Sequence, residues 1–142
     1  MNIIDINFKY LSKLKLNDVW IFDEREVGIT LNELVNLTID YDGTTFYVTA
    51  ITSSDFTNLN DGEFPAEVNP KYLTKTQLRH FKSVLYKIIT YVYNSEKLYQ
   101  SVMDKDYYSD LTTNQIDLVE TMQSNVEFKS LIDRIKLYLF FD

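Results

Sequence analysis

The segment that most constrains the fold is LVNLTIDYDGTTFYVTAI, residues 34–51, in which two alternating apolar runs flank Asp42-Gly43. An Asp-Gly pair accepts the positive φ angles of a two-residue type I′ turn, and alternation of apolar and polar residues is typical of half-buried strands. The sequence therefore predicts a β-hairpin over 34–51 in which Tyr41 faces Thr44. This register gives six further pairs: Ile39 with Phe46, Leu37 with Val48 and Val35 with Ala50 on the core face, and Asp40 with Thr45, Thr38 with Tyr47 and Asn36 with Thr49 on the solvent face.

The N-terminal segment carries a weaker signal. Residues 3–9 alternate in polarity, which favours a strand, although Ile6, Tyr10 and Leu14 also fit one face of a helix. We expect a strand over 3–9, a turn at Asn17-Asp18 and a second short strand over 19–22.

Two further segments lie next to the hairpin. Thr30 and Glu33 have the spacing of a capping box, but the alternation that begins at Val35 favours strand over a helical turn within 30–37. Residues 53–70 hold turn residues, both prolines and four acids with little periodicity, so we expect a long surface loop there.

The second half of the chain has helical periodicity. Three Thr-x-x-Gln or Ser-x-x-Glu sequences have the spacing of capping boxes: Thr74 with Gln77, Thr112 with Gln115, and Ser124 with Glu127. Four helices are predicted, over about 75–93, 95–103, 113–123 and 126–140.

Strands followed by helices indicate an α+β fold, in which an N-terminal antiparallel sheet packs against the C-terminal helices. With 142 residues but only three Gly and two Pro, the chain is expected to form a single domain, 1–142. Its first residues lack the pattern of a signal peptide, and no apolar run approaches the ~20 residues of a membrane helix. We therefore expect a cytoplasmic protein that does not bind membranes.

Few kinds of catalytic chemistry fit this composition. The chain has no cysteine and one histidine, His80, which we expect on the solvent side of its helix, so the usual zinc sites are excluded. The acids at 104, 106 and 110 lack the other residues of an EF-hand loop. No nucleophile elbow, Walker A loop, dinucleotide fingerprint or kinase signature is present. We expect a non-enzymatic protein with no metal and no cofactor.

Charge is segregated along the chain. The net charge is −7, and residues 26–70 contain eight carboxylates with no Lys, Arg or His. An acidic surface of this kind is either a solvated face or a recognition surface for a basic groove on a larger protein. Six acids of this segment are the predicted partner-binding residues: Asp40, Asp42, Asp55, Asp61, Glu63 and Glu67.

A basic stripe follows in the next predicted helix. At 100° per residue, Lys75, Arg79, Lys82 and Tyr86 lie on one side of it, beside the apolar face. Cations interleaved with tyrosines fit a nucleic-acid backbone and its bases. The alternative is that they pair with the protein's own acidic segment. A net charge of −7 gives no long-range attraction to nucleic acid, so direct binding is the weaker hypothesis.

The final turn, 137–141, is apolar all round. Leu137, Phe140 or Phe141 must be covered by another element, by a partner, or by a second copy in a homodimer.

Together these features predict a small acidic protein-binding module. Lys outnumbers Arg eleven to three and Ala occurs only twice, as expected from an A+T-rich genome. We expect a phage or mobile-element protein that inhibits a nucleic-acid enzyme of host defence, of the anti-restriction or anti-CRISPR type. The alternatives are a toxin-neutralising immunity protein and a nucleic-acid-binding module that uses the basic stripe of the 75–93 helix.

Overall fold

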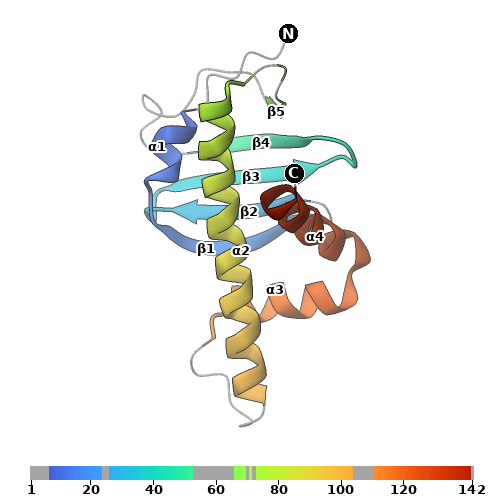
Figure 1. Ribbon diagram of the computed structural model, residues 1–142. Helices are drawn as coiled ribbons and strands as arrows, with labels where there is room; N and C mark the ends of the chain where they lie inside the picture. The colour runs from blue at the N-terminus through green and yellow to red at the C-terminus, as the bar shows by residue number, and fades with distance from the viewer. Residues whose placement is uncertain are drawn as a thin grey trace.

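The part of the chain that the structure describes forms one short helix, a five-stranded antiparallel sheet and three further helices (Figure 1). The structure is a computed structural model that describes residues 7–23, 26–52, 66–69, 71, 73–103 and 111–141. Its elements are α1 (Phe8–Ser12), β1 (Leu16–Asp23), β2 (Glu26–Leu31), β3 (Val35–Tyr41), β4 (Phe46–Thr52), β5 (Ala66–Val68), α2 (Lys75–Met103), α3 (Thr113–Ser124) and α4 (Val126–Phe140). The predicted α+β class, with a sheet before the helices, is confirmed.

The sheet is a simple meander in which each strand pairs with the next, in the order β1-β2-β3-β4-β5. Successive residues of a strand point to opposite faces, so one face collects the apolar side chains. Val19, Ile29, Leu37, Ile39 and Val48 on that face are fully buried. The core face predicted for the 34–51 segment is therefore confirmed at these positions of β3 and β4.

The predicted register of the hairpin is wrong, because its turn is wider than two residues. Tyr41 pairs with Phe46, and Ile39 faces Val48 rather than Phe46. Asp42 determines this width, since one of its carboxylate oxygens accepts hydrogen bonds of 2.9 Å from the backbone N–H groups of Thr44 and Thr45. Together with the hydroxyl of Thr44, also at 2.9 Å, these donors close a four-residue loop.

A β-bulge moves the register once more along β4. Beyond Thr49, Ala50 faces Thr38, and Ile51 takes the core position opposite Leu37. The bulge was missed because the alternation of apolar residues continues through it. It places the larger Ile51 in the core, where the uninterrupted register would have placed Ala50.

Two N-terminal expectations are corrected. Phe8 and Leu11 are buried on helix α1, whose N-cap Asn7 accepts a hydrogen bond from the Tyr10 N–H. The strand expected over 3–9 is therefore wrong from Phe8 onward. Residues 3–6 lie outside the described chain. Asn17-Asp18 is not a turn but part of β1.

The connection between β2 and β3 is a tight turn without helical geometry, which confirms the preference for strand within 30–37. Its central residues Asn32 and Glu33 both have positive φ, at 51° and 63°. The loop expected over 53–70 is wrong at its end, where Ala66–Val68 form β5 against β4. Residues 53–65 lie outside the described chain.

The helices begin near their predicted positions, but α2 does not end at residue 93. Ser95 is buried inside the helix, and its hydroxyl donates to the Tyr91 carbonyl at 2.8 Å and accepts from Gln115 of α3 at 3.3 Å. The predicted helices 75–93 and 95–103 are therefore one helix of 29 residues. At 1.5 Å per residue it is about 43 Å long. It extends past the β1 edge, where α3 packs on it (Figure 1).

Side-chain caps define the helix starts. The predicted boxes at Thr74/Gln77 and Thr112/Gln115 both form. The cap predicted at Ser124 is wrong, because Asn125 has the extended backbone that the position needs and accepts from the Phe128 N–H.

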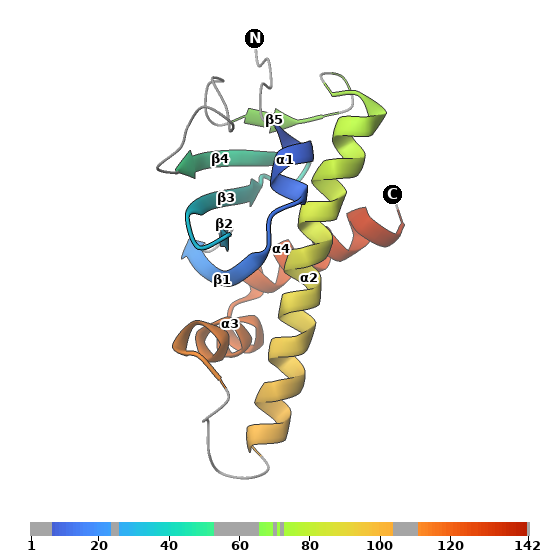
Figure 2. The same cartoon turned by 90° about the vertical axis from the view of Figure 1, so that its left-hand side faces the viewer.

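All described helices lie on the apolar side of the sheet or along its β1 edge (Figure 2). Phe81, near the N-terminal end of α2, is fully buried in this layer. Its ring lies 5.2 Å from that of Phe8, 6.0 Å from that of Phe46 and 6.3 Å from that of Tyr138. One aromatic cluster thus joins α1, the sheet, α2 and α4.

Two polar residues of α2 contact the α1 end. His80 is half-buried and its Nδ1 lies 3.5 Å from the Ser12 hydroxyl, so the expectation of a solvent-facing histidine is wrong. Lys87 donates to the backbone carbonyls of Ser12 and Leu14. Burial lowers the pKa of Lys87. Among the helices of the described residues, none is both long and apolar enough to cross a membrane.

We expect Lys87→Met to lower the free energy of unfolding by about 2 kcal/mol, because it removes charge-assisted bonds to two backbone carbonyls. Urea unfolding followed by circular dichroism measures the change. The control Lys75→Met removes an exposed cation from the same helix and should stay within about 0.5 kcal/mol of wild type. Equal effects of the two substitutions would contradict the assignment.

The loop bonds of Asp42 predict a pH dependence. The backbone N–H groups of Thr44 and Thr45 lower the pKa of Asp42 from 3.8 to about 2. A folded-state pKa below the unfolded value stabilises the protein above about pH 4, and this stabilisation is lost as the pH falls toward 2. Asp42→Asn should cost about 1 kcal/mol at pH 6, less than the full shift implies because solvent screens this exposed group.

Unfolding of wild type and Asp42→Asn at pH 6, 4 and 2 tests this dependence. The difference between the two proteins should shrink as the pH falls from 4 to 2, because about half of the folded-state Asp42 is protonated at pH 2. A difference that stays constant over this range would mean that the carboxylate charge does not stabilise the loop.

Candidate protein-binding surface

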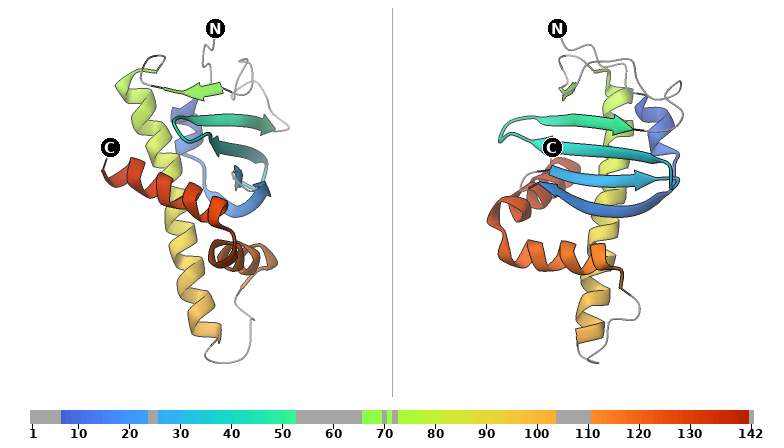
Figure 3. Two further views of the ribbon diagram at one scale, coloured as in Figure 1. Left: turned by 90° about the vertical axis from the view of Figure 1, so that its right-hand side faces the viewer. Right: turned by 180° about the vertical axis from the view of Figure 1, so that it is seen from behind.

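The second face of the sheet is not covered by any described helix (Figure 3). Its side chains come from the alternate positions of the strands and are mainly polar or aromatic. Phe22 of β1 is 59% exposed, and Asn36 of β3 and Thr52 of β4 are exposed as well. Strands β1 to β5 contain no Lys, Arg or His. We call this surface the open face.

A row of acids crosses the open face from β1 to β5. Asp23 pairs with Glu26, Glu26 with Asp40, Asp40 with Tyr47, and Tyr47 with Glu67. These five residues, one on each strand, form what we call the acidic row. Neighbouring strands are about 4.8 Å apart, so the row is roughly 19 Å long.

Placing like charges directly opposite one another destabilises a sheet by about 0.2–1 kcal/mol per pair. Glu26 and Asp40 form such a pair. The charge also affects Tyr47, whose pKa is raised by partial burial and then by the carboxylates of Asp42, Glu67 and Asp40. The row is therefore a local concentration of negative charge that the sheet does not require.

Neutral groups hold three of these carboxylates in place. The Thr49 hydroxyl donates to Glu26 at 3.0 Å, the Tyr41 N–H to Asp40 at 2.8 Å, and the Asn69 amide to Glu67 at 3.1 Å. Within the described part of the chain, none of Glu26, Asp40 and Glu67 forms an ion pair. These hydrogen bonds orient the carboxylates without neutralising them.

Trp20 adds an aromatic surface beside the row. It pairs with Gly28, and a Cβ atom at Gly28 would lie 2.1 Å from the Trp20 ring, so the indole lies directly on the glycine backbone. The indole N–H donates to the Thr30 hydroxyl at 3.2 Å, and this hydroxyl donates to Asn36 at 2.8 Å. The Phe22 ring lies 6.1 Å from that of Trp20. A flat indole of this kind suits a guanidinium or ammonium group.

The structure brings together only part of the predicted acidic surface. Asp40 and Glu67 belong to the acidic row, and Asp42 lies at the tip of the β3–β4 loop. The other predicted acids, Asp55, Asp61 and Glu63, lie outside the described residues.

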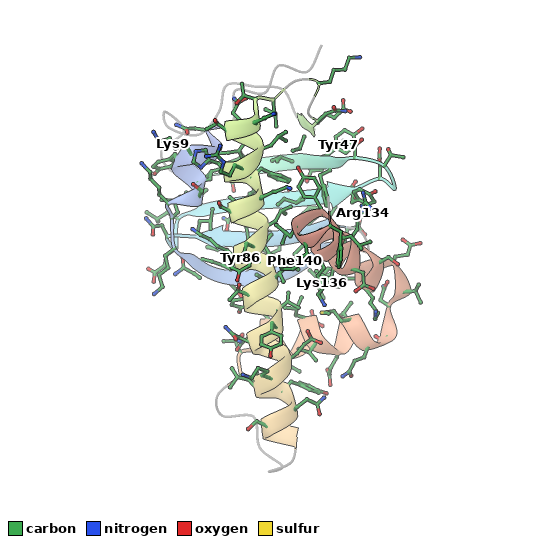
Figure 4. The ribbon with its side chains drawn as sticks, viewed as in Figure 1. Lys9, Tyr47, Tyr86, Arg134, Lys136 and Phe140 are labelled. Carbon is green, nitrogen blue, oxygen red and sulfur yellow. The ribbon has the colours of Figure 1, made fainter. Side chains whose placement is uncertain are left out.

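The basic stripe lies on the helical side of the molecule. Lys75 and Arg79 are exposed, and the Lys82 ammonium lies 4.9 Å from the centroid of the Tyr138 ring. Tyr86 packs its ring against Phe140 at 6.4 Å (Figure 4). Among the described residues, none of the three cations pairs with Asp40, Asp42 or Glu67. The suggestion that the stripe neutralises the acidic segment finds no support at these positions.

Sequence reasoning missed Trp20, Phe22 and Glu26 as residues of this surface, whereas Tyr47 was expected on the solvent face of the hairpin but not as a binding residue. Glu26 was within the cation-free segment, but its place beside Asp40 depends on the pairing of β2 with β3. Trp20 was read as part of an apolar strand, because nothing in the sequence shows that Gly28 lies beneath it.

We expect Gly28→Ala to displace the indole of Trp20, because the added methyl group would occupy the space of the ring. Trp20 is the only tryptophan, so its fluorescence reports this change alone. The emission should shift to longer wavelength, and stability should fall by about 1–2 kcal/mol. The control Thr52→Ala, on the same sheet, should change neither. An unchanged emission spectrum in Gly28→Ala would contradict the packing.

No group of three or more His, Cys, Asp or Glu within the described segments is arranged to hold a metal ion. Comparisons of the chain with family models, with curated proteins and with solved structures found no match. The chemistry of the open face is therefore the basis for a functional proposal.

Proposed function

We propose that this protein is a non-enzymatic binding module whose open face docks onto a basic surface of a larger protein. The observation that supports this proposal is the acidic row. It places carboxylates on adjacent strands at a cost in stability, orients three of them with neutral donors, and includes no cation among the described strands. Features that destabilise a fold locally are typical of functional sites.

The aromatic residues of the open face favour arginine and lysine in the partner. Trp20 presents an indole face, and Tyr47 lies within the acidic row itself. A guanidinium group can stack on an aromatic ring while it donates hydrogen bonds to a neighbouring carboxylate. The open face provides both kinds of group on adjacent strands.

A nucleic-acid enzyme is the partner class that best fits this chemistry, because its binding groove is already lined with Lys and Arg. Duplex DNA carries one charge per about 1.7 Å, whereas the row carries four carboxylates over roughly 19 Å. The row is thus too sparse to imitate a duplex, but it is long enough to occupy part of such a groove. We propose that the protein modulates a host-defence enzyme in the bacterial cytoplasm in this way.

Binding can be tested with Trp20 fluorescence and a panel of purified restriction endonucleases, CRISPR nucleases and basic ribonuclease toxins. We expect one of these enzyme classes to bind the protein. Its affinity should be at least tenfold lower at 300 mM salt than at 50 mM salt, and DNA or RNA should displace the enzyme from the protein. The double variant Asp40→Asn/Glu67→Gln should weaken this binding at least tenfold.

A matched control removes two charges elsewhere. Asp117→Asn/Glu33→Gln changes exposed acids of α3 and of the β2–β3 turn, and should leave affinity within about twofold. In the isolated protein, Asp40→Asn should raise stability by a few tenths of a kcal/mol, because it relieves repulsion from Glu26. No binding to any member of the panel at 50 mM salt, or equal losses in both double variants, would refute the proposal.

A further inference from the structure

A second surface, distinct from the open face, lies where α2 meets the end of α4. Four aromatic residues are exposed there: Tyr86 by 56%, Tyr93 by 60%, Phe140 by 58% and Phe141 by 80%. They surround a groove of about 530 Å³ whose floor includes Ile89. Figure 4 shows Tyr86, Lys136 and Phe140 side by side between the two helices. We call this surface the aromatic groove.

Within the described residues, nothing buries this surface, although Tyr138 and Leu139 of the same turn pack on the core. An aromatic side chain offers about 150–250 Å². The exposed fractions of the four rings therefore amount to roughly 400–600 Å², against about 800 Å² per partner in a stable interface. These rings alone supply half or more of the area that a stable interface needs.

The surface has both a recess and an exposed ring beside it. Phe141 projects at the end of α4, directly beside the hollow between Tyr86 and Tyr93. A twofold axis requires that each copy present both a projection and a matching recess, because the same patch must face itself. A groove and a projecting ring on one surface meet that requirement.

The charges at the groove are self-complementary. Glu96 of α2 and Lys136 of α4 both line it, and neither forms an ion pair within the described chain. Across a twofold axis, Glu96 of each copy would face the lysine side of its mate. A nucleic acid would meet the Glu96 carboxylate in the groove and be repelled by it.

We infer that a second copy of this chain covers the aromatic groove, forming a symmetric dimer in which Phe141 of each copy enters the groove of the other. Both open faces stay accessible in this arrangement, since the groove lies on the helical side. The dimer is therefore bivalent for whatever the open face binds.

Sedimentation equilibrium from 1 to 200 μM tests the dimer. We expect a mass that rises from 16.8 kDa to twice that value over this range. Tyr93→Ala/Phe141→Ser should weaken association at least tenfold. The matched control Phe22→Ser removes an exposed ring of the open face and should leave association unchanged. A monomer at every concentration, or equal losses in both variants, would overturn the inference.

A charge swap provides a second test that is independent of packing. Glu96→Lys should weaken the dimer at least fivefold, and Glu96→Lys/Lys136→Glu should restore it. Failure of the double variant to restore association would overturn the pairing. Asp40→Asn/Glu67→Gln should leave the dimer intact, so the outcome does not depend on the function proposed for the open face.

A vesicle-binding assay tests the other occupant of the groove. If the protein forms no dimer but binds phosphatidylcholine–phosphatidylglycerol vesicles, and Tyr93→Ala/Phe141→Ser abolishes this binding, the groove would be assigned to a lipid surface instead.

Discussion

The packing of Phe81 joins the layers of this architecture. Its ring contacts rings from α1, β4 and α4, so four elements meet at this point of α2. Because the helices that pack around this point lie on one side, only one face of the sheet is buried by them. Among the described elements, a single helical layer leaves the second face uncovered, and antiparallel sheets tolerate such exposure when their outward residues are polar.

The open face is polar in an unusual way. Thr, Asn and Ser would suffice to keep a sheet soluble, and the face does contain Thr30, Asn36 and Thr49. The acidic row is an addition that the fold does not need. Each like-charge pair costs little compared with the several kcal/mol of net stability of a typical domain. However, such pairs occur both between β1 and β2 and between β2 and β3. The aromatic residues beside the acidic row place rings and carboxylates on one surface.

The sequence predicted the elements better than their pairing. Local signals sufficed where a side chain acts on its own backbone, as with the Thr112/Gln115 box. They failed where pairing depends on distant residues, as with the bulge at Thr49, or where a side chain overrides a preferred turn, as with Asp42. Ser95 appeared to end a helix, because its contact with Gln115 of α3 could not be known in advance. Of the two predicted acids that lie in the row, Asp40 could be placed from alternation alone, whereas Glu67 depends on the pairing of β5 with β4, which the sequence did not indicate.

The separation of the acidic row from the cations of α2 has a consequence for how the molecule moves before any contact forms. Within the part of the chain that the structure describes, these opposite charges on opposite sides contribute an electric dipole moment in addition to the net charge. In the field of a cationic surface such a dipole experiences a torque, which turns the open face toward the source and the helices away from it. The range of this effect is set by the Debye length, about 8 Å at physiological salt, so the final approach is orientated rather than random. Redistributing the same charges evenly would keep the attraction and abolish the alignment.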